Sequence, residues 1–143
     1  MIIEITRRQF AQLSALQRSL VSAFAGLIGY GGWAYLVNSM HGPAAAIKAA
    51  CVQGGYSFAL TFVVTLLIEL IFRHLVQLMQ RPALAQLATF VLVCSILFSS
   101  SWWINVIAGT PEIFSTVILG YVIGAVYTAS YIRGLAASLR LTT

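Results

Sequence analysis

Four long apolar stretches, separated by short polar segments, dominate the pattern of the sequence. They cover residues 20–40, 44–72, 83–108 and 113–132. Each stretch reaches the roughly 20 residues that a helix needs to cross the hydrocarbon core of a bilayer. Lipid offers no hydrogen-bond partner to an unpaired backbone amide, so such stretches must be helical. The pattern therefore predicts an all-α membrane protein, with four transmembrane helices in one domain, residues 20–143.

The first 19 residues follow a different pattern. Apolar residues such as Phe10 and Leu13 share one helical face, and Arg7 and Arg18 lie largely elsewhere. Separate apolar and basic faces are typical of a helix that lies in the membrane interface. We therefore expect residues 1–19 to form a short amphipathic N-terminal interfacial segment on the cytoplasmic side.

The basic residues predict the orientation of the chain. Of the eight lysines and arginines, seven fall at one end of the expected bundle and only Lys48 falls near the other. Cytoplasmic connections carry an excess of Lys and Arg, so both termini are predicted to be cytoplasmic. This asymmetry and the compactness of the chain point to a bacterial inner membrane.

Composition supports membrane lipids as partners. Hydrophobic residues make up 60% of the chain and charged residues 8%, whereas a soluble domain has about 25% charged residues. The net charge of +5 comes from basic residues scattered at the ends of the spans. Such residues favour contact with anionic lipid headgroups and do not indicate a nucleic-acid partner.

The two expected outer turns resemble each other. They read "WAYLVNSMHGPAA" and "WWINVIAGTPEI", with Trp, then Asn, then Gly shortly before Pro. Proline is favoured at the first position of a helix, so each turn should start the next span. The shared pattern predicts two helical hairpins of the same orientation. They arise either by duplication or because the same turn chemistry recurs.

Small residues recur at four-residue steps in the first and fourth spans. They let the backbones of neighbouring membrane helices approach closely. We predict that four glycines are helix-packing positions: Gly26, Gly29, Gly120 and Gly124. Whether they meet within one copy or between two copies stays open at this stage.

The second span carries a polar row, with one polar residue at every fourth position. Its members are Gln53, Ser57, Thr61, Thr65, Glu69 and Arg73. A step of four residues advances about 40° around a helix, so the three hydroxyl residues in the middle stay on one face. Such hydroxyls bond to their own helix or to a neighbour, which should turn this face into the bundle. The polar row is predicted to line a pathway for a substrate or an ion.

Glu69 is the ionisable residue of this row that lies within a span. A buried charge in a membrane is costly, which makes it a candidate functional group by default. One interpretation gives Glu69 a transport role, in which it binds a proton, a cation or a cationic or zwitterionic headgroup. The other makes it a structural partner of Arg73, which lies one turn further in the favourable order.

A second polar cluster is expected at the outer ends of the spans. It consists of Asn38, His41, Lys48, Asn105 and Glu112. We expect these residues to form either an ion pair between Lys48 and Glu112 or an outer mouth for a small molecule, with Ser99, Ser100 and Ser101 facing the same vestibule. No spacing matches a catalytic triad, a metal site or a phosphate loop, so no metal or cofactor is predicted.

Three classes of function compete on this evidence. The prediction is transport or translocation of a small molecule, ion or lipid, by an oligomer because four helices alone leave little room for a path. The alternative is a non-catalytic accessory or scaffold subunit that binds a larger membrane-protein partner. An enzyme is the weakest class, because no second catalytic group can be named near Glu69.

Overall fold

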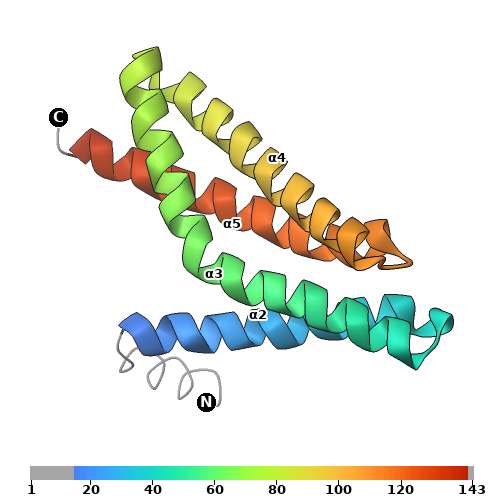
Figure 1. The fold of residues 1–143 in the computed structure, drawn as a ribbon. Coiled ribbons are helices and arrows are strands. Elements are labelled where there is room, and N and C mark those ends of the chain that lie inside the picture. The colour runs from blue at the N-terminus through green and yellow to red at the C-terminus, as the bar shows by residue number, and fades with distance from the viewer. Residues whose placement is uncertain (1–14, 142–143) are drawn as a thin grey trace.

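The computed structural model describes the backbone of residues 15–141 and the side chains of Gln17 and residues 20–137. This part of the chain is helical apart from the short connections at residues 42, 80–81 and 109–112, and it contains no strand (Figure 1). Its elements are α2 (Ala15–Asn38), η1 (Ser39–His41), α3 (Pro43–Met79), α4 (Pro82–Ala108) and α5 (Ile113–Leu141). Most of the predicted interfacial segment, residues 1–14, lies outside the described residues.

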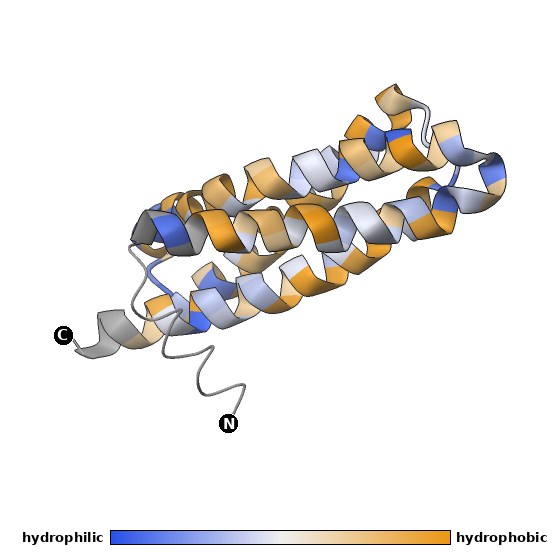
Figure 2. Cartoon of the chain, turned by 90° about the horizontal axis from the view of Figure 1, so that it is seen from below, coloured by the Kyte–Doolittle hydropathy of each residue, from blue (hydrophilic) through white to orange (hydrophobic). Residues whose placement is uncertain are grey.

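Four of these helices are long and apolar enough to cross a membrane, which indicates an integral membrane protein. Figure 2 shows apolar residues along most of each helix, with the strongly hydrophilic residues mainly toward the two ends of the bundle. The helix boundaries agree with the predicted spans, except that α3 and α5 continue further. With 37 residues, α3 is about 55 Å long, which exceeds the roughly 30 Å of a hydrocarbon core.

Successive helices run in opposite directions (Figure 1). The connections α2–α3 and α4–α5 lie at one end of the bundle, which we call the Asn38 end. The connection α3–α4 lies at the other, which we call the Arg73 end. Two glycines with left-handed backbone, Gly42 at φ 92° and Gly109 at φ 67°, allow the turns at the Asn38 end.

The α3 helix changes direction near its middle (Figure 1). In this region the hydroxyl of Ser57 donates to the carbonyl of Gln53 at 2.8 Å, and that of Thr61 donates to the carbonyl of Ser57 at 2.9 Å. Hydroxyl bonds to the carbonyl four residues earlier often bend a helix. Two members of the polar row therefore give a physical reason for the bend.

The first half of α3 packs closely against α2 through glycines that the sequence did not single out. A Cβ atom built on Gly54 would lie 2.7 Å from the carbonyl oxygen of Leu27, and one built on Gly31 would lie 3.0 Å from that of Ala50. Neither position has space for a side chain. The close helix contact that small residues permit is formed here, between α2 and α3.

The four glycines predicted as packing positions behave differently. A Cβ atom on Gly29 would meet nothing within 4 Å, and Gly26 and Gly120 have only ordinary contacts, from 3.5 Å upward. Gly124 has one closer neighbour, a methyl carbon of Leu97 at 3.3 Å, which is the end of a flexible side chain. For none of the four is a backbone atom of a neighbouring helix among the nearest neighbours, because the helices are rotated so that other small residues face each other.

The second half of α3 packs against α4 and α5 in an apolar cluster. The buried members of this cluster are Ile68, Phe72, Ala85, Val93, Leu97, Ile132 and Ala136. This core lies toward the Arg73 end and joins three helices. It does not include α2, which is attached through the first half of α3 and through contacts at the Asn38 end.

Candidate functional site

A cavity of about 1220 Å³ lies between α2, α3, α4 and α5. Its wall is formed within residues 22–30 of α2, 53–65 of α3, 97–101 of α4 and 117–131 of α5. In Figure 1, α2 and α5 come together toward the Asn38 end and diverge toward the Arg73 end. The cavity occupies this divergent region and is partly open to the outside.

The first four members of the polar row of α3 face this cavity, whereas Glu69 and Arg73 are not among its lining residues. Gln53, Ser57, Thr61 and Thr65 all line the wall, which is otherwise mostly apolar and aromatic. Five tyrosines contribute to it: Tyr30, Tyr56, Tyr121, Tyr127 and Tyr131. No Asp, Glu, Lys, Arg or His is among the lining residues. The cavity therefore offers hydrogen-bonding groups and apolar surface without a formal charge.

The four predicted packing glycines also line this cavity. Gly26 and Gly29 lie on the α2 side, and Gly120 and Gly124 lie on the α5 side. Their missing side chains leave space in the wall where a larger residue would project. Three of them also lie close to a side chain of another helix, with Gly124 nearest at 3.3 Å from Leu97, so these positions adjoin neighbouring helices and leave space in the cavity wall.

Gln53 marks the closed end of the cavity. Its side chain is 2% exposed, and its Oε1 atom accepts hydrogen bonds from Asn105 Nδ2 at 2.8 Å and from Ser101 Oγ at 3.3 Å. Asn105 Nδ2 also donates to the carbonyl of Ser101 at 2.9 Å, and Thr110 Oγ1 donates to Asn105 Oδ1 at 2.8 Å. These bonds join α3 to α4 and to the α4–α5 connection.

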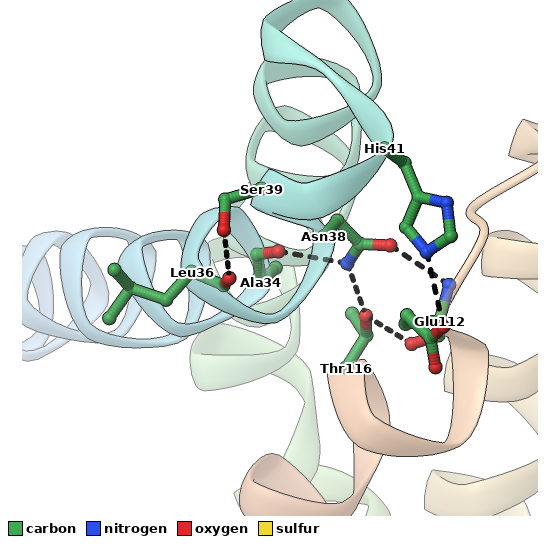
Figure 3. Close-up of polar contacts among 7 residues, drawn as sticks. All are labelled: Ala34, Leu36, Asn38, Ser39, His41, Glu112 and Thr116. Atoms are coloured by element: carbon green, nitrogen blue, oxygen red, sulfur yellow. Dashed lines mark hydrogen bonds and ion pairs between the residues drawn. The ribbon is translucent and has the colours of Figure 1, made fainter.

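A second set of bonds, buried or half-buried, joins α2 to α5 next to this network (Figure 3). Asn38 Nδ2 donates to Thr116 Oγ1 at 2.8 Å, and Asn38 Oδ1 accepts from the backbone amide of Glu112 at 2.9 Å. Trp33 Nε1 donates to the carbonyl of Ser115 at 2.7 Å. Together, the networks around Asn105 and Asn38 form what we call the closing layer.

Two of the five residues expected at the outer mouth are not accessible to a small molecule there. Asn38 and Asn105 are both 0% exposed, because the closing layer uses their amide groups to join helices. The expected pair between Lys48 and Glu112 is also wrong. Glu112 contacts His41 at 3.1 Å, and Lys48 is exposed on α3.

The serines of α4 do not share one vestibule either, since helical rotation points them in different directions. Ser99 is exposed, and Ser100 contacts the hydroxyl of Tyr56 at 2.7 Å. Ser101 is buried and bonded to Gln53. Only Ser101 among them belongs to the closed end of the cavity.

Glu69 lies toward the open end, outside the wall of the cavity. Its Oε2 atom pairs with Arg73 at 3.1 Å, as the structural interpretation expected, and its Oε1 atom accepts a bond from the Tyr131 hydroxyl at 2.8 Å. Tyr131 does line the cavity and stacks on Tyr127, whose hydroxyl contacts Thr65 at 2.9 Å. Glu69 thus reaches the cavity through Tyr131.

Replacing Asn105 with leucine is expected to lower the free energy of unfolding by about 2 kcal/mol, since it removes several buried hydrogen bonds and leaves their partners unpaired. Thermal unfolding in one detergent measures the loss. Ser99→Leu, on an exposed position of the same helix, is the control and should change stability by no more than about 0.5 kcal/mol. Equal stability of the two variants would show that the closing layer contributes nothing.

The pairing of Gln53 with Asn105 and of Glu69 with Tyr131 was not predicted. The sequence shows polar groups at matching depths in different spans. It does not show which of these groups bond to each other. Among the described residues, no group of three His, Cys, Asp or Glu side chains could hold a metal ion. No family model, curated protein or solved structure matches this chain.

Proposed function

We propose that this protein moves a small amphipathic molecule across the membrane, and that the molecule enters through the cavity between α2 and α5. The observation that carries the proposal is the asymmetry of this cavity. The closing layer, with Asn38 and Asn105 fully buried, seals one end, and α2 and α5 diverge toward the other. A transporter that alternates between two openings needs a binding space of this one-sided kind.

The chemistry of the wall supports an amphipathic cargo over an inorganic ion. An ion that leaves water needs an opposite charge or a dense set of ligands, and the lining residues carry no charge. The polar row can contact a headgroup, and the apolar wall and the gap between α2 and α5 can accommodate a hydrocarbon tail. Glu69, held by Arg73 and Tyr131, then acts beside the entrance and not as a site for the cargo.

The proposed orientation follows from the arginines. The Arg73 end faces the cytoplasm, with both termini there, and the described conformation is open to that side. The proposed home is a bacterial inner membrane, where the chain works as two similar helical hairpins within an oligomer. Membrane lipids are its immediate partners.

Lipid movement in vesicles tests the proposal directly. The purified full chain is reconstituted into phosphatidylcholine vesicles that contain fluorescent tail-labelled lipids with neutral, zwitterionic or anionic headgroups. External dithionite then bleaches only the lipids in, or arriving at, the outer leaflet. We expect at least one of these lipids to cross about tenfold faster than in protein-free vesicles, which corresponds to about 1.4 kcal/mol of barrier. Rates equal to those of protein-free vesicles for every lipid would refute the proposal.

One observation favours the alternative function of an accessory subunit. The gap between α2 and α5 exposes apolar helix surface, including Ile123 at 47%, and a helix of a partner protein could occupy it. Native mass spectrometry on the protein extracted from its own membrane separates the two functions. A stoichiometric partner, together with no lipid movement by the isolated chain, would favour the accessory subunit.

A further inference from the structure

We infer that the cavity binds an uncharged headgroup that carries hydroxyl groups, and that Gln53 contacts this headgroup at the closed end. The inference rests on the proposed function, because it names the class of molecule that the same cavity would move. It goes further by assigning one amide group as the recognition element. The assignment is based on which groups of the cavity wall donate hydrogen bonds within the protein and which accept them.

Four hydroxyl groups of the wall have already donated their hydrogen to the protein. Ser57 and Thr61 donate to carbonyls of α3, Ser101 donates to Gln53, and Tyr131 donates to Glu69. A hydroxyl oxygen that donates still has lone pairs and can accept. Toward a ligand, these groups therefore present acceptors.

Gln53 presents the opposite chemistry. Its Oε1 atom is occupied by Asn105 and Ser101, whereas its Nε2 atom has no hydrogen-bond partner among the described residues. The side chain is 98% buried and lines the cavity, so two N–H donors stand in its wall. A donor in a cavity wall that makes no bond within the protein gains a hydrogen bond when an acceptor enters the cavity.

The amide donors of Gln53 lie next to Gly120 of α5. A Cβ atom built on Gly120 would lie 3.5 Å from Gln53 Nε2 and 3.7 Å from the ring of Tyr30. The missing side chain leaves open the corner between the amide and the aromatic ring. A ring of carbon atoms that bears hydroxyl groups can place its hydroxyls on Gln53 and its carbon face on the tyrosine.

Other headgroups fit this wall less well. A carboxylate or phosphate would face the acceptor oxygens of Ser57 and Thr61 with no lysine or arginine in the wall, and an ammonium group would face the Gln53 donors with no carboxylate there. A ketone could accept from Gln53 but could not donate to the hydroxyl oxygens. A hydroxyl group does both.

Protection of an engineered cysteine tests the inference without measuring transport. Gly29 lines the cavity with open space around it, so a Gly29→Cys variant in a Cys51→Ser background places a thiol in the wall. The full chain in lipid nanodiscs reacts with a maleimide in the presence of decyl glucoside, decanoate or decyltrimethylammonium, each below its micelle concentration. The three probes share one alkyl chain and differ in the headgroup.

We expect decyl glucoside to slow the labelling at least about fivefold, and the two charged probes less than about twofold, as expected for one or two hydrogen bonds. A Gln53→Leu substitution in the same background should abolish the difference. Because Gln53 also stabilises the closing layer, Gly120→Ala serves as a second variant. Its added Cβ has only ordinary contacts, so the fold persists while the corner is filled.

The outcomes separate this inference from the proposed function. Equal protection by the three probes, or glucoside protection that survives both substitutions, overturns the headgroup assignment, and vesicle assays then decide translocation alone. Selective protection by the glucoside supports the headgroup assignment. If lipids also cross no faster than in protein-free vesicles, the proposed translocation is overturned.

Discussion

A Gly54→Val protein is expected to lose at least about 3 kcal/mol of stability, the upper range for an overpacked contact. The added Cβ would lie 2.7 Å from the carbonyl oxygen of Leu27, a distance that real Cβ atoms essentially never show. This oxygen belongs to the backbone of α2, so no side chain can rotate to make room. The substitution should therefore separate α2 from α3. Thermal unfolding in detergent, followed by helical circular dichroism, measures the loss.

The neighbouring glycine provides the control for this substitution. A Cβ on Gly55 would meet no atom within 4 Å, although Gly55 lies in the same helix and at nearly the same depth. Gly55→Val should keep its stability within about 1 kcal/mol of the parent protein, the scale of helix propensity differences. If the two variants unfold at the same temperature, the close contact between α2 and α3 is wrong.

The second large effect is expected on activity. A Gly29→Trp protein should move lipid at least about tenfold more slowly than the parent protein, which corresponds to about 1.4 kcal/mol of added barrier. Gly29 lines the cavity, and no atom lies within 4 Å of its built Cβ, so a large ring can project into the space without displacing the backbone. Stability should be nearly unchanged, which distinguishes this block from unfolding.

Gly32 lies on the same helix and supplies the matched comparison. It is exposed, a built Cβ on it meets nothing within 4 Å, and it is not part of the cavity wall. Gly32→Trp should therefore retain the parental rate in the same vesicles. If Gly29→Trp is as active as Gly32→Trp, the route does not pass through this cavity.

The helices themselves were predictable because lipid imposes a simple rule on length and polarity. Apolar runs of sufficient length gave all four long helices. Pro43 is the first residue of α3, as expected, whereas α5 begins at Ile113, two residues after Pro111. The far ends of α3 and α5 were placed too early, since helices continue through polar residues such as Arg73 and Arg133 once they have left the apolar region. Hydropathy measures where a helix meets lipid, not where its hydrogen bonds end.

The site was only partly predictable, because spacing along one helix says nothing about the rotation of its neighbours. The residues from Gln53 to Thr65 were predicted to face the interior of the bundle, and they line the cavity there. Several polar residues on one helical face rarely face lipid. The close backbone contact at Gly31 was not predicted, because Gly29 and Gly31 look alike in the sequence and differ only in which one faces α3. Asn105 was placed at a mouth for the same reason: a local pattern cannot show that a partner amide fills the space opposite.

The bend of α3 gives this one helix two sets of neighbours. Before the bend, Gly54 packs against α2, and after it, Ile68 and Phe72 pack within the apolar cluster shared with α4 and α5. The angle of α3 therefore sets how far the ends of α2 and α5 stand apart, whereas Asn38 keeps their other ends together. A straighter α3 would bring α2 toward α5 without breaking the bonds of Asn38. The proposed entrance would then take its width from the bend of this one helix, where Ser57 and Thr61 bond to their own backbone.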